Sequence, residues 1–392
     1  MRESFLPYCQ PHLDADDVNN ITESLKHGWL TTGPKVRELE ELAVTKSGVK
    51  NAICLNSCTA ALHLALVALG VKPGDEVVMP ALTFVAGAQC ARHIGAIPVF
   101  ADVDPATLCI TVETVRQVVT SKTKVIIPMQ YGGAPCDMQA MSTYANARGI
   151  RVLEDAAHAA GTLDQTGKWA GSYSSAAAYS FYATKNVTSA EGGMLLTNDD
   201  ALADRVRVLA LHGMDKDAWK RYTQSGKWRY DVIETGYKYN MPDLAASLGI
   251  AQFRKLERLQ MRRDQLAAYY LRELEGLPGI RPAAQIPNPP ARHSWCVFAV
   301  LVDEEKAGIS RDQLIEELTA QNIGTSVHFI PTHLFSAFAG TRCMLPNTEK
   351  LWRQLISLPL YPSMSDNDAR DVVLALQEIV GKKSADVRVA AG

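Results

Sequence analysis

The sequence has no large excess of either charge, no long apolar run and no CxxC cysteine pair. Its 40 Lys and Arg residues against 42 Asp and Glu residues leave a net charge of 40 − 42 = −2. This balance gives no reason to expect a nucleic acid or a membrane surface as a partner. No apolar stretch approaches the ~18 residues that cross a bilayer, and the opening MRESFLPYCQPHLDADD carries charge and proline where a signal peptide needs an apolar core. We therefore expect a cytoplasmic protein.

The eight cysteines are scattered along the chain and form no CxxC pair. Cys54 and Cys58 are close in sequence, but no second pair of metal ligands lies near them. A secreted disulfide framework would be denser and in a shorter chain. We expect reduced, mostly buried thiols and no metal site, at Cys9, Cys54, Cys58, Cys90, Cys109, Cys136, Cys296 and Cys343.

Short apolar runs alternate with helical patterns between residues 51 and 198. We expect helices at 60–69 and 138–148, and strands at 52–55, 76–79, 97–101, 124–128, 150–153, 176–181 and 193–197. Nearly unalternating apolar strands separated by helices are typical of a parallel sheet covered on both faces. Right-handed crossovers then place the carboxyl ends of the strands at one edge, where open α/β sheets bind ligands.

The length of 392 residues, with 47% hydrophobic residues, is enough for two or three domains and a large core. A helical stretch is expected over 243–274, followed by proline-rich connecting chain over 282–290. A strand at 295–302, helices at 311–321 and 366–380, and a loosely ordered tail at 382–392 complete the pattern. We place the division near 250–280, with a large domain at 1–255 and a smaller α+β domain at 256–392.

Three local motifs contain residues that suit chemistry. In NSCTAALHLAL, Ser57 and Thr59 stand between a strand and an apolar helix, where they can cap the helix or help its N-terminus to bind a phosphate. In IRVLEDAAHAAG, Asp155 follows a strand and His158 comes three residues later. In YSFYATKNVTSAEGG, Lys185 follows a strand among apolar and small residues. Taken singly, each motif is explained by a cap, a structural histidine or a solvated lysine.

Taken together, the three motifs match the needs of pyridoxal phosphate (PLP). Its phosphate suits a helix N-terminus, its pyridine nitrogen suits a carboxylate and its aldehyde condenses with a lysine. Asp155 would hold the ring nitrogen protonated, and a desolvated Lys185 loses its proton readily, as Schiff-base chemistry requires. All three groups fall at strand ends of one expected sheet.

The chain resembles the DegT/DnrJ/EryC1/StrS family of sugar aminotransferases. The resemblance rests on GWLTTGPKVRELE, NSCTAALHLAL, PALTFVAGAQ, ADVDPATL, EDAAHAAG, SFYATKN with AEGG, GYKYNMPD, GTSVHF and ISLPLYPSM, which cover nearly the whole chain. It implies PLP-dependent transferase fold type I, like aspartate aminotransferase: an α/β large domain with a mostly parallel sheet, and a smaller C-terminal α+β domain. Among its branches the chain looks most like the UDP-4-amino-4-deoxy-L-arabinose aminotransferases.

The resemblance also implies roles for individual residues. Lys185 would condense with the cofactor aldehyde, and Asp155 would pair with the pyridinium nitrogen. Asn240 would reach the phosphate of the neighbouring subunit's cofactor, which makes the active unit a homodimer with composite active sites. The remaining cofactor-binding positions implied are Ser57, Cys58, Thr59, Phe84, His158 and Ser180.

The substrate side is also implied by the resemblance. L-glutamate would give its amino group and leave as 2-oxoglutarate, and Lys185 would then move the proton that completes amination at C4 of a nucleotide-linked ketosugar. The segment beside the sugar includes His328, Phe329 and His333, with Tyr182 nearby. Arg229 and Lys238 are candidates for meeting the diphosphate. Phe84 stands where the arabinose branch tends to have Trp, and Tyr182 where that branch often has His.

Several functions stay open at this point. The acceptor could instead be a dTDP-4-keto-6-deoxyhexose or a 3-ketosugar in polysaccharide or secondary-metabolite synthesis. A PLP-dependent sugar dehydratase of the same fold is disfavoured, because those relatives carry histidine where this chain has Lys185. A non-catalytic PLP-binding regulator is disfavoured by the intact Asp155 and Lys185.

Overall fold

The computed structural model describes residues 2–215, 230–285, 288–341 and 343–391, and the side chains only as far as residue 383. Its main sheet has seven strands, and all seven expected strands form, with ends that differ from the prediction by at most two residues. They are β1 (Asn51–Leu55), β2 (Glu76–Pro80), β3 (Ile97–Ala101), β4 (Thr123–Ile126), β5 (Arg151–Asp155), β6 (Ala176–Ser180) and β7 (Gly193–Thr197).

The strands lie in the order β1-β7-β6-β5-β4-β2-β3. The pairs from β6 to β3 are parallel, whereas β7 runs antiparallel to both β6 and β1. The expectation of a parallel β7 is therefore wrong. The segment between Ser180 and Gly193 contains no helix, and a parallel return needs a crossover, so the chain comes back antiparallel.

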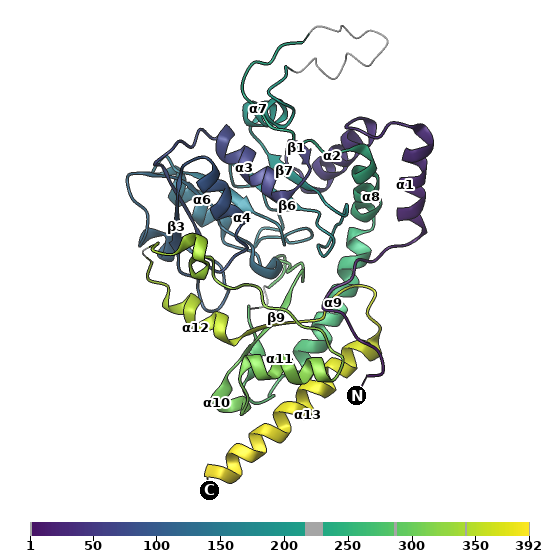
Figure 1. Cartoon of the computed structure of the whole chain (residues 1–392), viewed down its shortest axis with the longest axis vertical. Helices are drawn as coiled ribbons and strands as arrows, with labels where there is room; N and C mark the ends of the chain where they lie inside the picture. The colour runs from purple at the N-terminus through teal and green to yellow at the C-terminus, as the bar shows by residue number, and fades with distance from the viewer. Residues whose placement is uncertain (1, 216–229, 286–287, 342, 392) are drawn as a thin grey trace.

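Helices cover both faces of the sheet, as the apolar strands require (Figure 1). On one face the core includes α3 (Cys58–Ala68), α4 (Ala86–His93) and α7 (Asp200–Ala210). On the other face lie α2 (Pro34–Ser47), α5 (Val112–Arg116), α6 (Met138–Asn146) and α8 (Asp243–Arg254). Alternate residues of one strand serve opposite faces, as Ile53 and Cys54 do. The amino-terminal helix α1 (Ala15–His27) packs against α8.

The C-terminal third has its own three-stranded antiparallel sheet, in the order β10-β9-β8. Its strands are β8 (Ile280–Pro282), β9 (Phe298–Val302) and β10 (Leu355–Leu358). The helices around it are α9 (Leu256–Glu273), α10 (Glu304–Ala307), α11 (Arg311–Ala320), α12 (Pro346–Gln354) and α13 (Asp366–Ala391). Because α13 continues to Ala391, the expectation of a loose tail at 382–392 is not met over the described part.

The helical stretch expected over 243–274 is two helices that meet at Lys255. The Lys255 ammonium is buried there between Asp14, at 3.0 Å, and Asp17.

The core around the small sheet also contains Leu6, from the start of the chain. The domain division at 255/256 stays a prediction. Among the described residues, no helix is long and apolar enough to cross a membrane.

Candidate active site

The turn between β1 and α3, residues 56–59, is called the anion turn below, because it has free backbone N–H groups that suit an anion. Ser57 is the N-cap of α3, and its hydroxyl accepts a hydrogen bond from the Ala60 N–H at 3.0 Å. The first N–H groups of the helix, at Cys58 and Thr59, lie ahead of the helical ladder and remain available to an anion. Gly193 closes in from β7, where a Cβ would lie 2.3 Å from the Ser57 carbonyl carbon and 2.4 Å from the Cys58 nitrogen. This contact explains why the sequence has glycine at that position.

Asp155 ends β5, at the carboxyl edge of the sheet, with its side chain buried. One carboxylate oxygen accepts a hydrogen bond from the Ala157 N–H at 3.1 Å. Burial raises the pKa of Asp155 above its ordinary value of 3.8, while the Ala157 N–H and the positive charge of Lys185 act in the opposite direction. A buried carboxylate with spare acceptor capacity is suited to a cationic partner.

Lys185 lies on the loop after β6 and is half-buried. Its backbone N–H donates to the Tyr182 carbonyl at 3.0 Å, which holds the loop in a turn. The positive charge of Lys185 is close enough to lower the pKa of both Asp155 and His158. The structure therefore brings Lys185 and Asp155 to the same edge of the sheet, as the sequence predicts.

His158 is buried and held in one tautomer. Its Nδ1 accepts a hydrogen bond from the Gly132 N–H at 3.1 Å, so the ring proton is on Nε2. Burial, followed by the charge of Lys185, lowers the pKa of His158 well below 6.5. Its ring stacks on that of Phe329, with centroids 5.8 Å apart and planes at 16°. His158 is thus a neutral, oriented donor near Lys185.

His328 joins the same cluster from the C-terminal part of the chain. Its ring lies 6.3 Å from His158, edge to face, and its Nδ1 is 2.9 Å from the Ser357 hydroxyl. The Tyr131 hydroxyl donates to its backbone carbonyl. Burial and the charge of Lys185 lower the pKa of His328 to about 4, so both imidazoles are neutral at physiological pH.

The two predicted aromatic positions, Phe84 and Tyr182, are both exposed. Phe84 is 59% exposed, and its ring lies 6.3 Å from Phe329. Tyr182 is 47% exposed and lies two residues after Ser180, whose hydroxyl accepts from the Tyr182 N–H at 3.4 Å. Exposed rings beside buried polar groups are typical of the rim of a binding site.

Two predicted residues do not join the cluster. His333 lies against Phe100, with ring centroids 6.4 Å apart, and its Nε2 is 3.6 Å from the Glu349 carboxylate. Asn240 pairs through its backbone with Leu55, beside the anion turn but on a face turned to solvent. The predicted diphosphate contact at Arg229 lies outside the described residues.

Sequence reasoning missed the amino-terminal segment at residues 6–9. Leu6 forms a parallel bridge with Ile323, and both of its backbone hydrogen bonds are 2.8 Å long. This bridge carries Tyr8 onto His328, with ring centroids 5.2 Å apart. The Cys9 thiol donates to the Thr184 carbonyl at 3.5 Å, next to Lys185. No local motif marks these residues, because only the folded chain brings them to the site.

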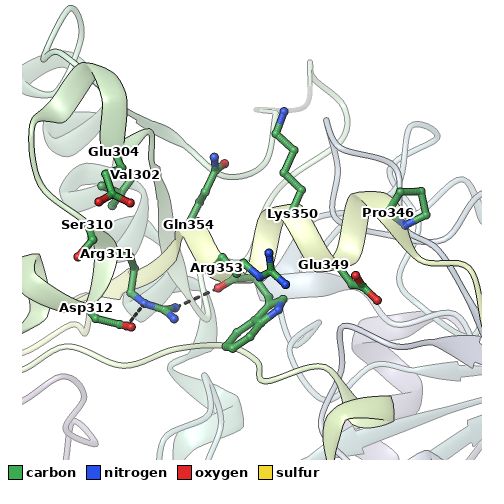
Figure 2. A pocket seen from close by; sticks show the side chains of 11 residues that line it. Val302, Glu304, Ser310, Arg311, Asp312, Pro346, Glu349, Lys350, Arg353 and Gln354 are labelled. Atoms are coloured by element: carbon green, nitrogen blue, oxygen red, sulfur yellow. Dashed lines mark hydrogen bonds and ion pairs between the residues drawn. The ribbon is translucent and has the colours of Figure 1, made fainter. Parts of the chain in front are cut away.

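A hollow of about 710 Å³ lies elsewhere, between α11 and α12 (Figure 2). Arg311 lies in it, but this side chain is already bonded to Asp312 and to the carbonyls of Trp352 and Leu355, at 3.0 and 2.8 Å. Every predicted site residue lies outside this hollow. Over the described part of the chain, no group of three or more His, Cys, Asp or Glu side chains could hold a metal ion.

The sheet order, with Lys185 and Asp155 at its carboxyl edge, is that of a PLP-dependent aminotransferase of fold type I. The model of the DegT/DnrJ/EryC1/StrS aminotransferase family matches residues 11–377, and the chain belongs to that family. Its members are sugar aminotransferases that use PLP, which confirms the family, the fold class, the enzyme class and the cofactor expected from the sequence. The dehydratase and regulator alternatives are thereby set aside.

Individual relatives agree with this assignment. The spore coat polysaccharide biosynthesis protein SpsC of Bacillus subtilis is 45% identical over 390 residues, which is 98% of this chain and 99% of that protein. Spr1654 of Streptococcus pneumoniae, described as a sugar aminotransferase, is 30% identical in its PMP form, with a TM-score of 0.89 over 96% of this chain and all of that one. DesI, solved with its TDP-sugar product, is 30% identical, with a TM-score of 0.87 over 100% of this chain and 97% of that one.

Proposed function

We propose that the enzyme transfers the amino group of L-glutamate to C4 of a nucleotide-linked ketosugar, with a UDP-4-ketopentose as the first candidate. The observation that carries this proposal is the meeting of the α3 N-terminus, Asp155 and Lys185 at one sheet edge. A nucleotide-linked acceptor, though not its UDP part, is supported by DesI, a relative solved with its TDP-sugar product. A role in polysaccharide synthesis is supported by SpsC.

The residues present fit the cofactor. The N–H groups of Cys58 and Thr59, with the Ser57 and Ser180 hydroxyls, would hold the phosphate at the N-terminus of α3, where the helix dipole favours negative charge. The Cys58 thiol donates instead to the Ala178 carbonyl, at 3.5 Å, so its backbone is the part left for the phosphate. Phe84 would cover one face of the PLP pyridine ring. The Asp155 carboxylate would bind the nitrogen of that ring.

When bound, PLP supplies an electron sink that stabilises negative charge at the substrate carbon. Asp155 would maintain that sink, because its carboxylate favours a protonated ring nitrogen. Lys185 would bind the cofactor aldehyde and, once released, take a proton from the donor and return it to the acceptor as general base and acid. His158, which is neutral and near Lys185, would hold the cofactor ring in place without competing with Lys185 for that proton.

The acceptor sugar would lie on the open side of the cluster. His328 and Phe329, whose rings are in edge-to-face contact, would form one wall there, and the exposed ring of Tyr182 would form another. Their ring faces and the imidazole of His328 suit a sugar, which presents both C–H surfaces and hydroxyls. His333 would act only indirectly, because its observed contacts are with Phe100 and Glu349.

A homodimer would complete the sites. Exposed apolar side chains gather on α1, the following turn and the start of α8, which lie side by side in Figure 1. They are Val18, Leu25, Trp29, Leu30 and Leu244, with exposed fractions between 37% and 61%. A second copy of the chain would cover this face, bringing Asn240 to the partner's phosphate. Sedimentation velocity tests this proposal: a monomer at assay concentration contradicts it.

The experiment that tests the function is a panel of nucleotide-ketosugars with glutamate as the donor. The expected result is glutamate-dependent amination of UDP-4-ketopentose, with release of 2-oxoglutarate. A preference for dTDP-4-keto-6-deoxyhexose or for a 3-ketosugar would overturn the pentose and leave sugar amination intact. Failure of every ketosugar, with glutamate still converting bound PLP to pyridoxamine phosphate, would overturn the nucleotide-sugar acceptor.

A further inference from the structure

The segment at residues 293–295, shortly before β9, is held by three buried side chains from other parts of the chain. Each of its three backbone carbonyls accepts a hydrogen bond, from Gln260 at His293 (3.1 Å), from Asn186 at Ser294 (2.7 Å) and from Arg263 at Trp295 (3.1 Å). Trp295 has a φ of 50°, in the left-handed region that a bulky side chain avoids. Such a backbone persists only where its surroundings fix it, so these contacts give the segment one conformation.

Asn186 is the one of these three donors that lies beside Lys185. It directly follows Lys185 in the chain, and only 3% of it is exposed. Its amide nitrogen donates a second hydrogen bond, to the Ala160 carbonyl at 3.2 Å. Its amide oxygen has no hydrogen-bond partner among the described residues. Because carbonyls can only accept, the amide has one orientation, and Asn186 acts here through its two N–H groups.

The backbone at Lys185 is thereby fixed on both sides. On the amino side, the Lys185 N–H donates to the Tyr182 carbonyl at 3.0 Å. On the carboxyl side, Asn186 is anchored to two segments, and the loop then returns to Phe181, whose carbonyl accepts the Ser189 N–H at 2.9 Å. The torsions of the Lys185 side chain are left to move its amine. A group that transfers a proton depends on such fixing, because a displacement of about 1 Å costs up to about 100-fold in rate.

Ser294 connects the same segment to His158. Its hydroxyl donates to the His158 carbonyl at 2.6 Å, and its backbone N–H donates to the Gly133 carbonyl at 3.2 Å. The packing is tight, because a Cβ on Gly133 would lie 1.9 Å from the Ser294 hydroxyl oxygen. One fully buried residue therefore holds the Lys185 loop through its carbonyl and the turn after Asp155 through its hydroxyl.

We propose that Asn186 is a positioning residue for amino transfer, which sets the backbone of Lys185 through the Ser294 carbonyl. Ser294 in turn couples the position of Lys185 to that of His158. This inference rests on the proposed role of Lys185 in proton transfer. Both residues act through backbone groups rather than by touching the cofactor or the sugar, and they make residues 293–295 part of what sets the rate.

The first test separates the rate of the reaction from binding. In N186A two buried carbonyls lose their donor, so we expect the glutamate half-reaction to slow by about 10- to 100-fold in stopped-flow measurements. The KM for glutamate and the dissociation constant of PLP should stay near the wild-type values, because the Asn186 amide faces backbone carbonyls. N186D keeps the shape of the side chain without the donors and should show the same pattern. A wild-type rate in both variants overturns the proposal, and so does an equally large rise in the dissociation constant of PLP.

Asn347→Ala is the matched control. The Asn347 amide also joins two distant segments, since it donates to the Val103 carbonyl at 3.0 Å, and it belongs to α12 rather than to the site. We expect N347A to keep the wild-type rate, even where it lowers the temperature of unfolding. If N347A slows the half-reaction as much as N186A does, the effect is a general loss of stability and the proposal is wrong.

Hydrogen exchange of the apoprotein tests the positioning without cofactor or substrate. We expect the backbone amides of residues 182–190 to exchange about 10-fold faster in N186A than in the wild type, the value for one lost hydrogen bond, and to be unchanged in N347A. Unchanged exchange over 182–190 in N186A overturns the proposal. If the exchange rises as expected but K185A keeps the visible band with PLP, the proposed role of Lys185 fails, which is a separate result.

The last test measures the coupling through Ser294. S294A removes the hydrogen bond to the His158 carbonyl and leaves the backbone carbonyl that Asn186 uses. We expect S294A to slow the half-reaction as well. Because the two contacts share one residue, the loss of rate in the N186A/S294A double variant should be smaller than the product of the two single losses. A loss equal to that product means that the contacts act independently, which overturns the coupling.

Discussion

Substitution of Gly193 by alanine tests the geometry of the anion turn directly. The added Cβ would lie 2.3 Å from the Ser57 carbonyl carbon, 2.4 Å from the Cys58 nitrogen and 2.5 Å from the Ser57 oxygen. All three atoms belong to the backbone, so no side-chain rotation relieves the contact. The φ angle of Gly193 lies outside the left-handed region, which leaves this contact as the only obstacle to alanine.

The size of the effect follows from the displacement that is needed. The contact must lengthen from 2.3 Å to an ordinary 3.4 Å, so β7 and the turn must separate by about 1 Å. Overpacking of this kind costs about 1–3 kcal/mol of stability, and a 1 Å displacement of a binding group costs up to about 100-fold in function. We expect the dissociation constant of PLP to rise by about 10- to 100-fold.

The assay is a titration of the apoprotein with PLP, followed by the visible band, beside thermal unfolding of the apoprotein. Gly87→Ala, inside helix α4, is the matched control, because a Cβ there lies at ordinary contact distances from the Met79 sulfur, 3.6 Å, and from the Ile127 Cδ1, 3.9 Å. We expect that control to bind PLP normally and to be as stable as the wild type or more so. Wild-type PLP affinity in G193A would refute the argument that this close approach shapes the anion turn.

Three further predictions concern charge. Lys185→Ala and Lys185→Arg should both abolish the visible band and amino transfer, because neither side chain can condense with an aldehyde; a persisting band would reassign the lysine. Asp155→Asn should slow the glutamate half-reaction by at least about 100-fold in stopped-flow measurements, because an amide cannot stabilise a ring proton; an unchanged rate would contradict this role. Burial raises the pKa of Glu40 to about 7 from 4.5, so the folded state holds a proton that the unfolded state releases, and stability should fall by at most about 3 kcal/mol between pH 4.5 and 7. Apoprotein unfolding in Glu40→Gln should lack that fall, and the same slope in the variant would exclude Glu40 as its source.

The sheet and the two central site residues could be predicted because their signals are local. Each strand is an apolar run that needs burial on both faces, and Asp155 and Lys185 each follow such a run. Parallel strands then bring their carboxyl ends together whatever the loops do. For the same reason, His158, three residues after Asp155, falls in the cluster.

What could not be predicted depends on contacts between distant segments. The direction of β7 follows from the absence of a helix before it, and the helix break at Lys255 follows from a buried ion pair with Asp17. Tyr8 reaches His328 only through the bridge at Leu6. His333 stands five residues after His328, yet the chain turns it toward Glu349. No periodicity or motif encodes such encounters.

The bridge between Leu6 and Ile323 has a practical consequence for work with this enzyme. A chain that lacks residues 1–9 would lose both Tyr8 and Cys9. The Lys185 loop and the His328 imidazole would then be exposed to water. Arg2 is also anchored, by ion pairs to Asp368 and Asp371 of α13 at 2.7 and 2.6 Å. A purification tag at this end would therefore disturb the segment that holds Tyr8 and Cys9 against the site. Tags for kinetic work therefore belong at the other terminus.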